Sequence, residues 1–164
     1  MNDAKTVREI RINPTMPSES VLVASARGLR PRQEEERIPH ETRAHVETCP
    51  FCKGNEDKTP PTITALPDDE NWNIRIVQNL FPVLGTESDQ SNISFGMQQV
   101  MDGYGHHEVI IDHHKHGMEI HEMSHEHLEM LVGIYRSRME ELYSADDRIK
   151  YVLVFKNFGS AAGA

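Results

Sequence analysis

Residues 107–142, HEVIIDHHKHGMEIHEMSHEHLEMLVGIYRSRMEEL, decide the fold class, because a strand pattern and a helix pattern follow each other in them. Apolar and β-branched residues dominate 107–112, which predicts a strand. Ser124 is a typical N-cap, and acidic residues follow where the positive end of a helix dipole favours them. We therefore predict an α+β fold in which an antiparallel sheet packs against a helix at 124–144.

The apolar residues of this helix recur at helical spacing and predict the face that it buries. They are Leu128, Leu131, Val132, Tyr135, Met139 and Leu142. Strand patterns elsewhere predict three further strands, at residues 20–25, 73–79 and 150–156. Two stretches lack such patterns, 33–71 and 85–105, and we expect irregular loops there.

Length and charge limit the possible functions. The 164 residues suggest one domain, here 19–164, preceded by a polar, loosely attached arm at 1–18. The formal net charge of −9 would repel a polyanionic backbone, so nucleic acid is an unfavourable partner. The sequence has no apolar run long enough to span a bilayer and no secretory signal, so we expect a cytoplasmic protein without membrane contact.

Cys49 and Cys52 are the only cysteines, and their spacing lets both thiols reach one metal ion. A tetrahedral Zn²⁺ would take two more ligands, which histidines supply readily. A redox pair or two inert thiols are the alternatives. A metal-buffering module is another hypothesis, since eight histidines gather between residues 106 and 127. They are His106, His107, His113, His114, His116, His121, His125 and His127.

Two features favour phosphate binding. Arg27 and Arg30 lie three apart around a glycine, and two guanidinium groups can hold one phosphate. The terminal sequence FGSAAGA, 158–164, offers small residues and backbone N–H groups after a predicted buried strand. A solvated turn is the alternative for the arginines. Together with a zinc-anchored loop, these features indicate nucleotide or sugar phosphate chemistry.

Five motifs in one order carry a family resemblance: SARGLRPR, CPFC, WNIRIVQNLFPVL, HEVIIDHHKHG and VFKNFGSAAGA. This order resembles the N-terminal half of the galactose-1-phosphate uridylyltransferase family, which is part of the histidine triad superfamily. The resemblance implies a half-domain of histidine triad type with a zinc-anchored loop. It also implies a homodimer for the full-length protein.

The resemblance assigns residues to two sites. Cys49, Cys52 and His116 match the family's zinc ligands, which leaves His113 and His114 without a role in the metal site. The positions that match nucleotide-binding residues are Arg27, Arg30, Asn79, Asn157, Gly163 and Ala164. In the family's dimer the two arginines reach the neighbouring subunit's nucleotide.

The implied activity is transfer of uridylyl from UDP-glucose to galactose 1-phosphate, in galactose metabolism, through a uridylyl-histidine. The family's H-x-H-x-Q signature, which supplies the nucleophile and a fourth zinc ligand, is expected just beyond Ala164. We therefore expect the chain to be an inactive fragment of a larger transferase. Leu80, where some members have an acid, and the SAAGA stretch favour an alternative, an adenylyltransferase or nucleotide-sugar phosphorylase. A non-catalytic metal- or nucleotide-binding module is the third hypothesis.

Overall fold

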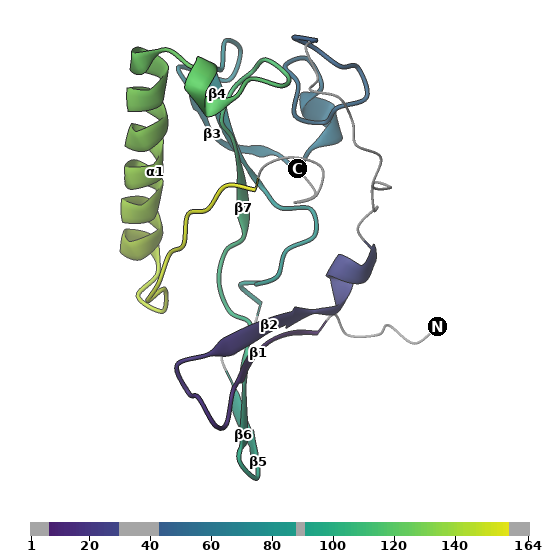
Figure 1. The fold of residues 1–164 in the computed structure, drawn as a ribbon, viewed down its shortest axis with the longest axis vertical. Helices are drawn as coiled ribbons and strands as arrows, with labels where there is room; N and C mark the ends of the chain where they lie inside the picture. The colour runs from purple at the N-terminus through teal and green to yellow at the C-terminus, as the bar shows by residue number, and fades with distance from the viewer. Residues whose placement is uncertain (1–6, 30–42, 88–90, 158–164) are drawn as a thin grey trace. The chain divides into compact units, whose positions relative to one another are not determined.

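The structure, a computed structural model, describes residues 7–29, 43–87 and 91–157 and has the predicted α+β fold (Figure 1). The chain forms two compact units, each built from two stretches of sequence. The first unit comprises Met1–Pro31 and Val77–Val109, and the second comprises Arg32–Ile76 and Ile110–Ala164.

The first unit contains a four-stranded antiparallel sheet in the order β2-β1-β6-β5. Its strands are β1 Arg8–Ile12, β2 Ser20–Ala24, β5 Asn92–Phe95 and β6 Gln98–Asp102. The predicted strand at 20–25 is confirmed as β2. The irregular structure expected at 85–105 and in the arm is corrected by β5, β6 and β1. Backbone pairing explains the difference, because β1 bonds to β2 on one side and to β6 on the other.

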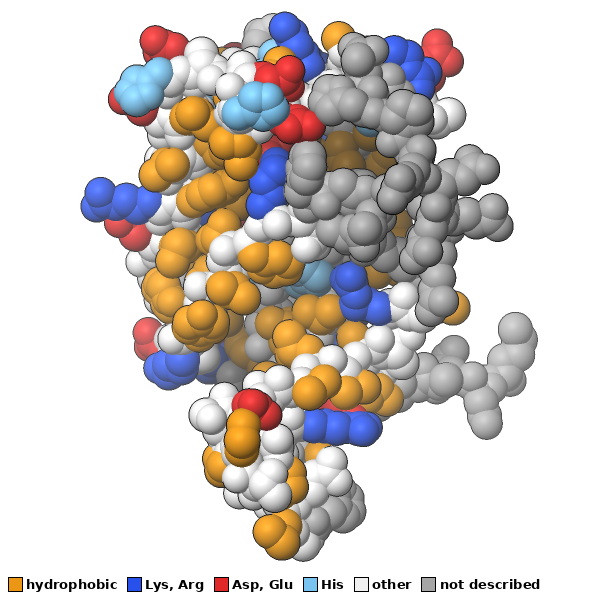
Figure 2. All heavy atoms as spheres, in the orientation of Figure 1, with side chains coloured by type: hydrophobic (Ala, Val, Ile, Leu, Met, Phe, Trp, Pro, Cys, Tyr) orange, Lys and Arg blue, Asp and Glu red, His pale blue; other side chains and the backbone are white. Residues whose placement is uncertain are grey.

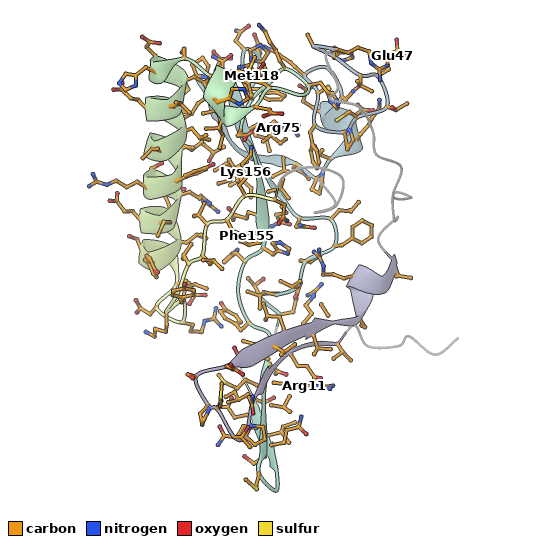
Figure 3. The ribbon with its side chains drawn as sticks, in the orientation of Figure 1. Arg11, Glu47, Arg75, Met118, Phe155 and Lys156 are labelled. Carbon is orange, nitrogen blue, oxygen red and sulfur yellow. The ribbon has the colours of Figure 1, made fainter. Side chains whose placement is uncertain are left out.

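A three-stranded sheet in the order β3-β4-β7 supports the helix α1. The elements are β3 Thr62–Leu66, β4 Ile74–Gln78, β7 Glu108–Ile111 and α1 His125–Ala145. β4 and β7 confirm the strands predicted at 73–79 and 107–112, whereas β3 lies in a stretch expected to be irregular. The core of the second unit consists of Ile74, Ile76, Met123, Leu131 and Ile134. Met118, labelled in Figure 3, packs against this core.

The helix α1 begins as predicted and buries most of the predicted face, with Val132 as the exception. The Ser124 hydroxyl accepts the His127 N–H at 3.2 Å, so the N-cap is confirmed. Leu131 and Ile134 are both 3 % exposed, whereas Val132 is 65 % exposed and was wrongly placed on the buried face. A step of one residue turns a helix by about 100°, which carries Val132 away from the sheet. Figure 2 shows hydrophobic side chains on the surface over α1.

Residues 151–157 do not form the strand predicted at 150–156. Tyr151, Leu153 and Phe155 are 76 %, 62 % and 63 % exposed, so the apolar side chains remain at the surface. Two contacts hold the segment: the Val152 N–H donates to Tyr143 Oη at 3.0 Å, and Lys156, labelled in Figure 3, pairs with Asp112. A strand needs a neighbour for its backbone groups, and the hydrogen bonds and ion pairs of the described residues place no such strand beside this segment. No helix in the described part of the chain is long and apolar enough to cross a bilayer.

Candidate functional site

A tight turn in the second unit brings the two cysteines together. The Cys49 N–H donates to the Val46 carbonyl at 3.1 Å, and the Cys52 N–H donates to the Cys49 carbonyl at 3.4 Å. The Asn55 side-chain amide closes the turn by donating to the carbonyls of Cys49 at 2.8 Å and Val46 at 3.2 Å. Gly54 has a φ of +95°, a backbone conformation that glycine adopts at little cost.

His116 completes a group of three side chains that could hold a metal ion. Its Nδ1 lies 3.4 Å from Cys52 Sγ, and the candidate ligand atoms of Cys49, Cys52 and His116 all lie within 4.8 Å of one another. The His116 N–H donates to the Ala44 carbonyl at 2.9 Å, which ties this loop to the segment before the cysteines. Tetrahedral Zn²⁺ with ordinary bond lengths separates its sulfur and nitrogen ligands by about 3.5 Å, so the geometry fits.

Without a cation, the turn disfavours the thiolate form of Cys52. Burial raises the pKa of the Cys52 thiol, and the Val46 N–H, which donates to Sγ at 3.4 Å, acts in the opposite direction. A divalent cation would stabilise the thiolate, as metals do for coordinating thiols. Two cysteines and a histidine are ligands that Zn²⁺ commonly takes, so the residues present fit this metal.

The cysteine turn and the residues that follow it, 49–62, form a loop that we call the metal loop. Hydrogen bonds that need no ion also hold this loop. The Trp72 indole N–H donates to Glu56 Oε1 at 2.7 Å, and the same carboxylate accepts the Gly54 N–H at 3.0 Å. Arg75, labelled in Figure 3, is 2 % exposed and donates to the hydroxyls of Thr59 at 2.6 Å and Thr62 at 2.8 Å. Sequence reasoning assigned no such role to Trp72 or Arg75, because their partners are distant in sequence and form no local pattern.

Among the described residues, the remaining histidines do not form a second ligand group. The group of Cys49, Cys52 and His116 is the one set of three or more candidate ligands among the described residues. His113 instead stacks on His114 and His127, with ring centroids 4.5 Å and 4.6 Å away. Burial and the neighbouring histidines lower the pKa of His113 to about 4, so its ring is neutral at pH 7. This favours one compact site over the metal-buffering module.

Two predicted nucleotide-binding residues meet in the first unit. Arg27 Nη1 donates to the Phe81 carbonyl at 3.4 Å, and Asn79 Oδ1 accepts the Phe81 N–H at 2.8 Å. Both side chains are half-buried. Asn157 lies in the second unit and is exposed. Arg30, Gly163 and Ala164 lie outside the described residues.

Known proteins resemble this chain over most or all of its length. The family model described as "Galactose-1-phosphate uridyl transferase, N-terminal domain" matches residues 1–164. The curated "ADP-glucose phosphorylase" of Arabidopsis thaliana is 30 % identical over 159 residues, which are 95 % of this chain and 45 % of that protein. The chain thus spans about half the length of this relative.

Two solved structures are also similar. A crystal structure of an ADP-glucose phosphorylase from Arabidopsis thaliana, with bound ADP-glucose, has a TM-score of 0.58 at 28 % identity and covers 94 % of this chain and 44 % of that one. A galt-like protein from Arabidopsis thaliana has a TM-score of 0.61 at 30 % identity and covers 74 % of this chain and 38 % of that one.

Proposed function

Because the chain belongs to the galactose-1-phosphate uridyl transferase family, we propose that the protein transfers a nucleotidyl group from a nucleotide sugar, with ADP-glucose as donor and phosphate as acceptor. The observation that carries the choice of adenine is the likeness to ADP-glucose phosphorylase over 95 % of the chain. Leu80 agrees with it, since this side chain is 65 % exposed where some family members have an acid.

In the proposed reaction, the bond between the α-phosphorus of ADP-glucose and the bridging oxygen breaks. Glucose 1-phosphate leaves with that oxygen, and an oxygen of inorganic phosphate ends on the α-phosphorus, which gives ADP. We place the nucleophile of a two-step route in an H-x-H-x-Q signature beyond Ala164, because these 164 residues lack this signature. Splitting a difficult transfer into two displacements is a common use of a histidine nucleophile.

Within this chain, Arg27, Arg30 and Asn79 would bind the nucleotide, together with Asn157, Gly163 and Ala164 at the end of the sequence. Guanidinium and backbone donors stabilise the charge that develops on a transferred phosphoryl group. Cys49, Cys52 and His116 would hold zinc. When bound, zinc supplies cross-links that fix the loop, and its role is structural.

The decisive experiment uses a polypeptide that carries this sequence and continues through the expected signature. It is mixed separately with ADP-glucose and UDP-glucose, without acceptor, and its intact mass is measured. An adenylyl adduct supports the proposal, and the absence of any adduct contradicts it. Phosphate labelled with oxygen-18 then identifies the bond that breaks: label in ADP supports attack at phosphorus, whereas label in glucose 1-phosphate contradicts it.

Transfer of uridylyl from UDP-glucose to galactose 1-phosphate is the second candidate. The description of the matching family model favours it. A uridylyl adduct in the same experiment, released by galactose 1-phosphate and not by phosphate, would establish this candidate in place of the first.

A further inference from the structure

His107 accepts a hydrogen bond from the backbone of Val83 through one ring nitrogen, and its other ring nitrogen lies next to Asn79. The Val83 N–H donates to His107 Nδ1 at 3.1 Å, so Nδ1 is an acceptor. A neutral imidazole has one acceptor and one donor nitrogen, and Nε2 must therefore carry the proton. Burial and then the charge of Arg27 lower the pKa of His107, which keeps the ring neutral at pH 7.

Asn79 is fixed in the same way. Its Oδ1 accepts the Phe81 N–H at 2.8 Å, and this assigns the other end of the amide as the NH₂ group. Asn79 Nδ2 lies 3.3 Å from His107 Nε2. Two N–H donors therefore face each other at a hydrogen-bond distance, with no acceptor between them.

No protonation state of His107 removes this conflict. Moving the ring proton to Nδ1 would oppose the Val83 N–H, and a charged ring would oppose both neighbours. Turning the Asn79 amide over would oppose the Phe81 N–H. The arrangement that keeps both backbone hydrogen bonds leaves the His107 Nε2–H and an Asn79 N–H side by side, each requiring an acceptor from outside this group.

We propose that His107 and Asn79 together bind one anionic oxygen of the ligand, a phosphate oxygen of the nucleotide. Both side chains are half-buried, so a ligand can reach them. The half-buried Arg27 donates to the carbonyl of Phe81, whose N–H binds Asn79, and this places a cation in the same group. Paired donors beside a guanidinium favour an anion over an uncharged oxygen. The nucleotide identity of the ligand rests on the proposed function.

Two variants at one position separate ligand binding from loop support. In His107→Asn the amide oxygen takes the place of Nδ1 and can still accept the Val83 N–H, but the Nε2–H donor is lost. In His107→Gln the longer side chain places a donor near Nε2 and loses the Nδ1 acceptor. The matched control is His125→Asn, because His125 is 83 % exposed and pairs with Glu129 on the surface of α1.

Binding of AMP, adenosine and inorganic phosphate is measured by calorimetry. We expect His107→Asn to weaken AMP binding roughly ten- to a hundredfold, the effect of one hydrogen bond to a charged group. His107→Gln should lose less affinity, and the control none. A loop-supporting role alone predicts the opposite order. Equal affinity of His107→Asn and the unaltered protein, or no binding of any probe, would overturn the proposal. Binding of adenosine with the same sensitivity to His107→Asn would overturn its assignment to a phosphate oxygen.

A second measurement does not depend on a ligand. Long-range nitrogen–proton NMR spectra of protein labelled with nitrogen-15 in histidine report the tautomer of each ring. We expect the Nε2–H form at His107, and the Nδ1–H form would overturn the inference even if nucleotidyl transfer is established. Conversely, failure of nucleotidyl transfer with AMP binding that depends on His107 would refute the proposed function and leave the inference intact.

Discussion

Replacing Cys52 with serine tests the metal centre directly. Cys52 is 1 % exposed, and its sulfur lies 3.4 Å from both His116 Nδ1 and the Val46 nitrogen. Serine retains an atom that can accept the Val46 N–H, so the turn keeps its internal hydrogen bond. The thiolate ligand is lost. We therefore expect Cys52→Ser to lose metal while the core of the second unit remains folded.

The size of the effect follows from the number of ligands. Structural zinc sites are worth about 10–16 kcal/mol, and dividing this among four ligands gives about 2.5–4 kcal/mol for each. Removal of one thiolate should therefore weaken zinc binding about 10²–10³-fold. His116→Ala should have an effect of the same order, because the imidazole is a ligand of the same group.

The assay is a competition between the protein and a chelator of known zinc affinity, supported by the metal content of dialysed protein. His121→Ala is the control, since the His121 side chain is 76 % exposed and pairs with Glu119. Zinc affinity should be unchanged in this control. If Cys52→Ser and His116→Ala both bind zinc as tightly as the unaltered protein, the assignment of this metal centre is wrong.

Three further predictions concern the supports of the site. Leu131→Ala should lower the free energy of unfolding by about 2–5 kcal/mol, because Leu131 is buried in the core. Val132→Ala, at the exposed neighbouring position, should change this free energy by less than about 0.5 kcal/mol. Equal effects of the two variants in urea unfolding would contradict the assigned helix face. Trp72→Phe removes the donor to Glu56 and should destabilise the protein by about 1.5–3 kcal/mol, and an unchanged urea midpoint would exclude a contribution from this bond. Because the pKa of His113 is lowered to about 4 in the folded state, the unfolded chain binds its proton first as the pH falls. The associated stability is present above about pH 6.5 and is lost toward pH 4, so His113→Gln should flatten this part of a stability–pH profile.

Local patterns predicted the parts of the fold that depend on neighbours in sequence. The N-cap at Ser124 and the helix after it were found because a cap and a helical period occupy consecutive residues. The periodicity predicted the side of the helix that faces the core, since Leu131 is buried there, but it did not fix the edge of that side. Val132 belongs to the apolar set by sequence and is exposed, whereas Ile134 was not in the predicted set and is buried in the core. Spacing alone defines a stripe, and the packing partner selects its edge.

The prediction of a strand at 150–156 was wrong for a related reason. Its residues have high strand propensity, yet propensity describes how well side chains suit a half-buried sheet. In the described part of the chain, Val152 binds a side-chain hydroxyl and Lys156 binds a carboxylate, and neither contact is part of a backbone ladder. A run of apolar residues therefore predicted the preference of the segment but could not supply the neighbouring strand.

The candidate metal ligands were predicted by resemblance, since His116 lies 64 residues from Cys52 in sequence. His107 had no comparable signal. Its partners Val83 and Asn79 lie 24 and 28 residues away, and one of these contacts is to a backbone N–H, which no residue type marks. The unpaired N–H donor at His107 Nε2 becomes evident only when the hydrogen-bonding atoms of His107, Asn79 and their backbone partners are assigned together.

The metal loop has two independent kinds of support, hydrogen bonds that need no ion and the proposed zinc site. Glu56 and Arg75 attach residues 54–62 to Trp72 and β4 through hydrogen bonds that need no ion. The core residues Leu131 and Ile134 lie on α1, which contributes no metal ligand. If zinc binds as proposed, its removal would therefore release the link between His116 and the cysteine turn without opening the core. It follows that a chelator should change hydrogen exchange around Cys49–Cys52 and His116 far more than at α1, and equal changes at both places would show that the metal supports the whole unit.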